Sequence, residues 1–175
     1  MKKRQTLSPG YSPVTATPLG TVWVAAGQAG LIAVSLWEKP RFLADLYKLT
    51  GVEGRLAPDL LREPVAQIRQ FLCGERRDFN LSIDWSVMTP FQENVLRRVA
   101  AIPFGSILTY SDIAREINRP KAARAVGRAN AANPLPLVIP CHRIIGADGR
   151  LHGFSAPGGL ETKAWLLQQE GSWVL

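Results

Sequence analysis

Three residues that can do chemistry follow one another at Cys141, His142 and Arg143, directly after Pro140. A thiolate is a strong nucleophile, and it forms where a positive charge or a hydrogen-bond partner lowers the pKa of the thiol. In a turn after Pro140 the three side chains can converge or connect through a water molecule. The run favours a nucleophilic cysteine, but an inert buried cysteine beside a surface histidine is the commoner arrangement for such residues taken alone.

The other cysteine, Cys73, falls on the apolar face of a predicted helix and has no histidine beside it. Two cysteines in 175 residues do not make a disulfide framework, and they exclude an all-cysteine zinc site. The spacing of Cys73, Cys141, His142 and His152 matches no structural zinc pattern. We therefore expect an inert Cys73, no metal, and a reducing compartment in which Cys141 stays a free thiol.

The composition is that of a soluble globular protein with excess positive charge. Hydrophobic residues make up 46% of the chain and charged residues 20%. Lys and Arg number 21 against 14 Asp and Glu, so the net charge is +7. Such a charge favours nucleic acid as a partner, although solubility alone would explain it equally well. No apolar run follows the basic first residues, so we expect no signal peptide and no membrane span.

The first half of the chain, residues 1–87, is predicted to be a small α+β domain. Residues 1–18 are rich in Ser, Thr and Pro and predict a loose leader. Hydrophobic patterning then predicts two strands joined by a hairpin turn, two helices and a third strand. Their ranges, in that order, are 20–26, 30–37, 41–49, 59–73 and 79–85.

The second half, residues 88–175, is predicted to consist mostly of helices and turns. Thr89 and Pro90 are a plausible N-cap and first residue of a helix that runs up to Pro103. A short helix over 110–117 (capped by Ser111 or Thr109), a tight turn at 118–120 and a second helix over 121–132 suggest a helix-turn-helix.

The second helix of this pair carries basic residues among very small ones. Lys121, Arg124 and Arg128 share one face, and most other positions are Ala or Gly. Small side chains let a helix backbone approach a nucleic-acid groove, and a basic stripe supplies phosphate contacts. An Ala-rich helix with a solvated Arg face is the alternative. The face expected to pack inward consists of Ala122, Val126 and Ala129.

Residues 140–145, Pro-Cys-His-Arg-Ile-Ile, resemble the active-site signature of the O6-alkylguanine-DNA alkyltransferase family. The resemblance is strong over residues 88–171 and weaker in the first half. It implies an α+β protein with a small N-terminal α/β domain of the ribonuclease H-like kind at 1–87 and a mostly helical winged helix-turn-helix domain at 88–175. The similar blocks are 102–105, 109–110, 123–127, 133–134, 153–155, 159–163, 165–167 and 170–171, with 18–21 and 30–31 in the first half.

The resemblance implies direct DNA repair by a suicide methyltransferase. Cys141 would accept the alkyl group of an O6-alkylguanine flipped out of duplex DNA, once per molecule and without a cofactor; repair of O4-alkylthymine stays open. His142 matches the family's base, which acts through a water, and Glu170 matches the residue that orients it. Tyr110 matches the donor to the leaving guanine. The implied substrate pocket comprises Tyr110, Asn133, Pro136, Ile144, Phe154 and Ser155, with Phe154 standing where some members have tyrosine.

The resemblance also implies the DNA contacts. Arg124 matches the arginine finger that fills the space left by the flipped base, on a helix that lies in the minor groove. The implied contacts on this helix are Lys121, Ala122, Ala123, Arg124, Ala125, Gly127 and Arg128. We expect a cytoplasmic, nucleoid-associated monomer that binds double-stranded DNA with alkylated guanine and no membrane; assembly along DNA is left open.

Three alternatives compete with this interpretation. A non-catalytic sensor of alkyl lesions would bind DNA without Cys141 chemistry, and such proteins usually lack the cysteine. A transcription regulator would use the helix-turn-helix alone, but we expect no additional regulatory domain within these 175 residues. A cysteine hydrolase would usually hold its Cys and His far apart in sequence, whereas here they are adjacent.

Overall fold

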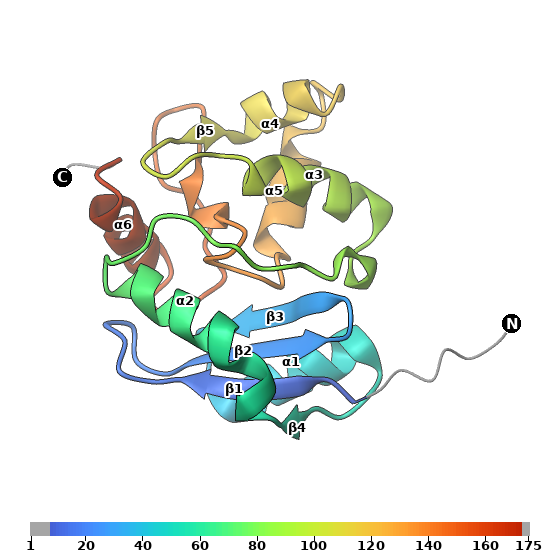
Figure 1. Ribbon diagram of the computed structural model, residues 1–175. Helices are drawn as coiled ribbons and strands as arrows, with labels where there is room; N and C mark the ends of the chain where they lie inside the picture. Colours follow the sequence, from blue (N-terminus) through green and yellow to red (C-terminus); the bar gives the residue numbers. More distant parts are fainter. Residues whose placement is uncertain (1–7, 173–175) are drawn as a thin grey trace, which may run out of the picture. The chain divides into compact units, whose positions relative to one another are not determined.

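A computed structural model describes residues 8–172, and the chain divides into two compact units, residues 1–87 and 88–175. The secondary structure is mixed: the first unit is built on a four-stranded sheet, and the second is mainly helical (Figure 1). None of the helices in the described range is long and apolar enough to cross a membrane.

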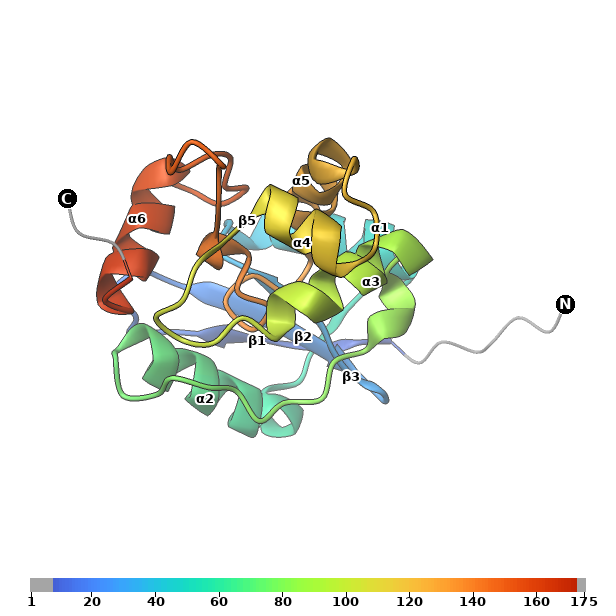
Figure 2. The same ribbon diagram turned by 90° about the horizontal axis from the view of Figure 1, so that it is seen from above.

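The first unit is a sheet of order β3-β2-β1-β4 with a helix on each face (Figures 1 and 2). Strands β1, β2 and β3 pair antiparallel, and the short β4 pairs parallel to β1. Its elements are β1 (Gly10–Val14), β2 (Val22–Gly27), β3 (Gly30–Ser35), α1 (Lys39–Thr50), β4 (Arg55–Leu56), the 3₁₀ turn η1 (Pro58–Leu61), α2 (Arg62–Leu72) and the 3₁₀ turn η2 (Trp85–Val87).

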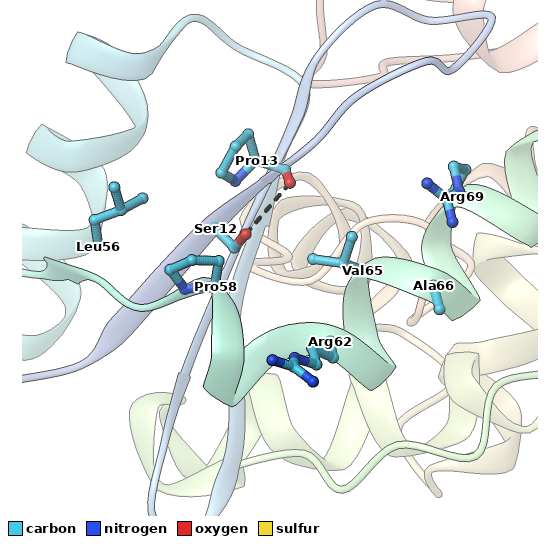
Figure 3. Close-up of a pocket in the computed structure, with 8 residues that line it drawn as sticks. All are labelled: Ser12, Pro13, Leu56, Pro58, Arg62, Val65, Ala66 and Arg69. Atoms are coloured by element: carbon cyan, nitrogen blue, oxygen red, sulfur yellow. Dashed lines mark hydrogen bonds between the residues drawn. The ribbon is translucent and has the colours of Figure 1, made fainter.

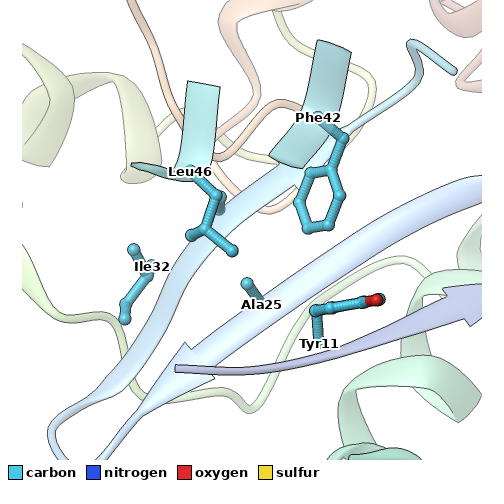
Figure 4. Close-up of a cluster of buried hydrophobic side chains, with 6 residues drawn as sticks. Tyr11, Ala25, Ile32, Phe42 and Leu46 are labelled. Atoms are coloured by element: carbon cyan, nitrogen blue, oxygen red, sulfur yellow. The ribbon is translucent and has the colours of Figure 1, made fainter. Parts of the chain in front are cut away.

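The core between the sheet and α1 is aromatic and aliphatic (Figure 4). The Tyr11 ring lies edge-on to Phe42, with 5.8 Å between ring centroids, and Trp23 stacks on Phe42 at 5.8 Å. Leu46 follows Phe42 by one helical turn and is equally buried. Aromatic pairs of this geometry add to the stabilisation that burial itself provides.

The expectation of a loose leader over 1–18 is wrong for residues 10–14, while residues 1–7 lie outside the described range. Those five residues form the buried strand β1. The carbonyls of Pro9 and Tyr11 accept hydrogen bonds from the N–H groups of Arg55 and Ala57, on the side of β1 where β4 lies. Backbone groups point to the same side of a strand at every second residue, so the backbone of Pro13 also points to that side, beyond the last residue of β4. Its missing N–H therefore breaks no ladder bond, which is how a strand tolerates proline.

Two other expectations for the first unit need correction. Residues 79–85 form no strand: Ile83 makes an isolated bridge to Leu31, and η2 begins at Trp85. The helix predicted over 59–73 opens as a 3₁₀ turn and ends at Leu72, so Cys73 is an exposed capping residue and not part of an apolar face. The hairpin and the helix predicted over 41–49 are confirmed.

The second unit gathers α3, α4 and α5 into a three-helix cluster, with a two-stranded parallel sheet and α6 beside η3. Thr89 caps α3 by accepting from the Gln92 N–H, and Thr109 and Asp112 form a capping box at the start of α4. The elements are α3 (Pro90–Ala100), β5 (Leu108–Thr109), α4 (Tyr110–Glu116), α5 (Ala123–Ala131), the 3₁₀ turn η3 (Cys141–Arg143), β6 (Ile144–Ile145) and α6 (Leu160–Gln169).

The second helix of the predicted helix-turn-helix begins later than expected. Helix α5 starts at Ala123, after Ala122 as its N-cap, so Lys121 belongs to the preceding turn and does not share a helical face with Arg124 and Arg128. The turn after α4 contains Asn118, whose φ of 58° turns the chain away from the helix, and Pro120, which has no N–H. Val126 and Ala129 are buried as predicted, whereas Ala122 is only partly buried.

Candidate active site

The reactive cysteine of the sequence motif, Cys141, opens the 3₁₀ turn η3 and is 5% exposed. Two asparagines at the end of α5 fix the loop that precedes it. The Asn130 side-chain N–H donates to the Cys141 carbonyl at 3.1 Å. The Asn133 side chain donates to the Ile139 carbonyl at 2.9 Å and accepts from the Leu135 N–H at 3.0 Å. Asn133 therefore links Leu135 near the start of the loop to Ile139 near its end. The hydrogen bond from Asn130 holds the backbone of Cys141 in place.

That loop contains a strained residue. Leu137 is buried and has a φ of 75°, a region that a bulky non-glycine side chain rarely adopts. Such a conformation costs on the order of 1–3 kcal/mol and persists only where the surroundings over-determine it. The two hydrogen bonds of Asn133 supply part of that constraint.

A buried carboxylate lies beside the cysteine turn. Glu170, the residue that ends α6, accepts from His142 Nε2 at 2.8 Å. Arg143 donates to the same carboxylate from Nε at 2.8 Å and from Nη2 at 2.9 Å. All three side chains are within a few per cent of complete burial. Arg143 and Glu170 therefore form a buried ion pair.

The segment between α3 and β5 completes this buried network. The Ile102 carbonyl accepts from Arg143 Nη1 at 2.6 Å, and the Phe104 ring lies 5.7 Å from the guanidinium. The Gly105 N–H donates to Glu170 at 3.3 Å. Gly105 has a φ of 75°, where a side chain would be strained, so this turn needs glycine.

The protonation states of the pair follow from burial and charge. Burial raises the pKa of the Glu170 carboxyl, but hydrogen bonds from His142 and Arg143 outweigh it and lower the pKa to about 2. Burial lowers the pKa of His142, against the raising effect of Glu170. An ionised carboxylate can only accept, so the neutral imidazole carries its proton on Nε2. The basic lone pair of His142 is therefore on Nδ1.

A lysine that the sequence patterns alone did not single out, Lys163 on α6, is completely buried near the cysteine. Its Nζ donates to the carbonyls of Ile144 at 2.5 Å and His152 at 2.8 Å. Burial lowers the pKa of Lys163 to about 8, while the negative charge that Cys141 can carry raises it. Near neutral pH this position holds a cation in a poorly solvated environment.

Tyr110 reaches the same region from the start of α4. The parallel pairing of β5 with β6 sets Thr109 opposite Ile145, and Tyr110 follows directly. Its hydroxyl donates to the His152 carbonyl at 3.4 Å. Burial and the charge of Cys141 raise the pKa of the Tyr110 hydroxyl, so it stays protonated and able to donate.

Burial raises the pKa of the Cys141 thiol, and a hydrogen bond from Asn133 and the charge of Lys163 oppose that effect. The resting group is therefore a thiol, and the Asn133 donor and the Lys163 cation would stabilise the thiolate; the neutral imidazole belongs to the next residue, His142. The arrangement can support nucleophilic attack once a base removes the proton.

The hollow at Cys141 is small in this conformation, about 20 Å³, room for about one water molecule. Of the predicted pocket residues it includes Asn133, Pro136, Phe154 and Ser155; Tyr110 and Ile144 are not among its lining residues, and Ile144 is fully buried in β6. The remaining lining residues, which the sequence patterns did not predict as such, are Asn130, Ala131 and Gly153.

Helix α5 presents a basic surface. Arg124 and Arg128 are exposed, as is Lys121 in the preceding turn, and within residues 8–172 none of the three takes part in an ion pair. The Tyr110 ring is 3.7 Å from where a Cβ on Gly127 would lie, so α4 packs closely on α5 at this residue.

A larger hollow, about 450 Å³, lies in the first unit between β1 and α2 (Figure 3). Arg62 and Arg69 flank it, and Ser12 donates weakly to the Pro13 carbonyl at 3.4 Å. Its lining residues include no cysteine, histidine or carboxylate. The groups able to react are at Cys141, although the space there is smaller.

Family models match most of the chain. The model described as the DNA binding domain of 6-O-methylguanine DNA methyltransferase matches residues 90–172, and the model described as its ribonuclease-like domain matches residues 11–85. The chain is 37% identical over 167 residues to the methylated-DNA–protein-cysteine methyltransferase of Salmonella typhimurium, covering 91% of this chain and 95% of the relative. It is also 37% identical to the inducible enzyme of that name from Bacillus subtilis, covering 90% and 82%.

Solved structures agree with this result. The O6-methylguanine methyltransferase of Mycobacterium tuberculosis is similar with a TM-score of 0.76 and 30% identity, over 95% of each chain. Mycobacterium tuberculosis OGT in complex with DNA is similar with a TM-score of 0.75 and 32% identity, over 93% of each chain. With two family models covering both units and relatives matching along nearly their whole length, this chain belongs to the 6-O-methylguanine DNA methyltransferase family.

Proposed function

We propose that this protein repairs DNA directly, by moving the alkyl group of an O6-alkylguanine irreversibly onto Cys141. The observation that carries the proposal is a buried thiol adjoining a neutral histidine, the Glu170–Arg143 ion pair and a buried lysine. The names of the relatives describe methyl transfer from methylated DNA to a protein cysteine, which is this chemistry.

The first step is loss of the thiol proton. His142 takes it through a water molecule on Nδ1, since Nε2 is committed to Glu170. The imidazolium that forms is stabilised by the Glu170 carboxylate, as in other base–orienter pairs. The positive charge of Lys163 stabilises the thiolate at Cys141.

The second step is displacement at carbon. Cys141 Sγ forms a bond to the alkyl carbon as the bond from that carbon to guanine O6 breaks, and the electron pair leaves with the guanine. Tyr110 donates a proton to the leaving base and is restored by solvent. The thioether product is stable, so each protein molecule acts once.

The base must leave the duplex before it reacts, at a cost of a few kcal/mol. The hollow of about 20 Å³ is smaller than a purine, and we propose that its wall at residues 153–155 moves outward when the base enters. We propose that α5 lies in the minor groove with Arg124 in the vacated stack, and that Arg128 and Lys121 contact phosphates. The small residues Ala123, Ala125 and Gly127 permit the close approach.

The non-catalytic sensor is not favoured, because Cys141 is present with the groups that would activate it. We expect a monomer acting in the cytoplasm on nucleoid DNA, with guanine lesions as the main substrate and O4-alkylthymine as a further candidate.

The test is to mix the protein with duplex DNA that carries one O6-methylguanine, then measure intact mass and map peptides. We expect one methyl group per protein, on Cys141, absent in Cys141→Ala and retained in Cys73→Ala, which removes the exposed cysteine. Tight binding of the lesion without any gain of mass would favour the sensor instead.

A further inference from the structure

One backbone carbonyl, that of His152, meets two of the polar side chains that act on Cys141. It accepts from the Tyr110 hydroxyl at 3.4 Å and from Lys163 Nζ at 2.8 Å. Both side chains interact electrostatically with Cys141. This carbonyl therefore contributes to placing the proposed proton donor and, together with the Ile144 carbonyl, the buried cation.

The side chain of His152 is fastened to the turn that precedes it. His152 Nε2 lies 3.0 Å from Asp148 Oδ1 and 3.2 Å from Oδ2. Asp148 Oδ1 also accepts from the Arg150 N–H at 3.1 Å, and the Gly146 N–H donates to the Arg150 carbonyl at 2.9 Å. The carboxylate thus belongs to a closed turn, and the imidazole is anchored to that turn.

The fit beneath this pair requires glycine. A Cβ on Gly146 would come within 2.3 Å of Asp148 Oδ1 and 2.5 Å of His152 Nε2, closer than real contacts allow. The two side chains close over the Gly146 backbone, so any larger residue would displace one of them. This space is a second observation, independent of the hydrogen bonds, that the pair is a built feature of the turn.

We propose that His152 and Asp148 form a clamp that positions Tyr110 and Lys163 for alkyl transfer to Cys141. Both are positioning residues, since neither lines the hollow at Cys141. The proposal rests on the proposed function and adds two side chains to it that the resemblance does not assign.

The clamp also separates the donors from one wall of the pocket. Residues 153–155 line the hollow, and we place there the movement that admits a base. Gly153, Gly158 and Gly159 in and after this wall have φ values of 30°, 77° and 52°, a region that favours glycine. Anchoring residue 152 confines the movement to residues 153–159 and leaves the carbonyl on Tyr110 and Lys163.

A hydrogen bond from His152 lowers the pKa of the Asp148 carboxyl, so Asp148 is an ionised acceptor in the clamp. Two other ionisable groups meet the backbone carbonyl of His152: Lys163 from α6 and Tyr110 from α4.

The experiment measures single-turnover methyl transfer from O6-methylguanine duplex DNA at increasing DNA concentration. For His152→Ala we expect the maximal rate to fall about two- to fivefold, the size expected of a half-exposed pair. In Asp148→Asn the amide oxygen still accepts from Arg150 and from His152, so its rate should fall less. The half-saturating DNA concentration should not change, and the thermal midpoint should fall by no more than about 4 °C. Arg150→Ala is the matched control, because it removes a charge from the same turn without touching the pair.

A conservative donor separates positioning from simple structure. In His152→Gln the side-chain amide can still donate to Asp148, so its rate should be close to that of wild type, whereas His152→Ala should be slower.

The outcomes that overturn the clamp are distinct from those that overturn the function. Wild-type transfer with an unchanged rate in His152→Ala would overturn the clamp alone. A rate in His152→Gln as low as that of His152→Ala, or an equal fall in the Arg150→Ala control, would also overturn it, in favour of a structural role of the turn. A wild-type protein that transfers no methyl group would overturn the proposed function and the clamp with it.

Discussion

The two units bury different kinds of side chain. In the first, the core facing α1 is built on Tyr11, Phe42 and Leu46, and within residues 8–87 the buried polar residues are Ser12 and Gln67. In the second, charged and ionisable side chains lie at 6% exposure or less: His142, Arg143, Lys163 and Glu170.

The difference indicates where the molecule does its work. Each apolar side chain that the core removes from water stabilises the folded protein. A buried ion pair often does no better than hydrophobic residues of the same volume, so stability alone does not explain the interior of the second unit. Ionisable groups with shifted pKa values gather at functional sites, and here they surround Cys141.

The largest expected effect comes from breaking the buried network. Glu170→Gln leaves Arg143 without its counter-charge, which should lower the free energy of unfolding by about 3–5 kcal/mol. It also removes the carboxylate that orients and stabilises His142, so methyl transfer should slow on the order of 100-fold. Urea unfolding and single-turnover transfer measure the two losses.

The matched control is Phe42→Ala in the apolar core. It should cost a similar amount, about 3–5 kcal/mol, and leave the rate of transfer unchanged at a temperature where the protein stays folded. If Glu170→Gln, like Phe42→Ala, lowered the free energy of unfolding and left the rate of transfer unchanged, the buried charges of the second unit would have no role in the reaction.

The next effect is the response to acid. The Glu170 carboxyl has a pKa of about 2 against an ordinary 4.5, so its contribution is present above pH 4.5 and is lost as the pH falls toward 2. The loss should be roughly 3 kcal/mol. His142 also lowers the stability of the folded protein as the pH falls. Its pKa is lower in the folded protein than in the unfolded chain, so the unfolded chain binds that proton first.

Urea unfolding from pH 7 to pH 3 checks this prediction. Wild type and Glu170→Gln should converge as the pH falls, since a protonated glutamate resembles glutamine. If the difference in free energy of unfolding between wild type and Glu170→Gln stayed constant from pH 7 to pH 3, the Glu170 carboxylate would contribute no pH-dependent stability.

A smaller effect is expected from the exposed charge of α5. Arg124→Ala should slow transfer from duplex DNA about tenfold, or about 1.4 kcal/mol, because the flipped-out base is no longer replaced in the stack. Transfer from the free base should be unaffected. Arg128→Ala removes another exposed arginine of the same helix, and as a proposed phosphate contact its loss should raise the half-saturating DNA concentration and leave the maximal rate unchanged. Equal losses on both substrates would count against the finger role.

The sequence predicts features that depend on neighbouring residues. The caps at Thr89 and Thr109 and the hairpin near Gly30 are confirmed, because capping and turn chemistry act within a few residues. Strand β1 was not predicted, because a proline inside a strand is unusual. Pro13 is tolerated here because the short strand β4 pairs only with Gly10 and Tyr11 of β1. The pattern over 79–85 was misleading, because alternation does not show whether a partner strand exists.

The site was predictable only in part. Cys141 and His142 stand out by type and adjacency, but Glu170 lies 28 residues from His142 and only the family resemblance pointed to it. Asn130 and Lys163 were missed as parts of the site. An asparagine inside an Ala-rich helix and a lysine on the last helix look like surface residues until tertiary packing buries them.

The central claim, that the buried charge in the second unit serves Cys141, is tested most directly by the rate of methyl transfer in Lys163→Met between pH 6 and pH 9. Methionine keeps most of the volume and removes the charge. With a pKa of about 8, Lys163 is a cation below that pH and a neutral amine, still able to donate to Ile144 and His152, above it.

We predict that wild type exceeds the variant about tenfold near pH 6, equivalent to about one unit in the pKa of the thiol. The ratio should shrink as the pH rises through 8. A ratio that is constant across the range would assign Lys163 to hydrogen bonding alone, and a ratio of one throughout would contradict the claim.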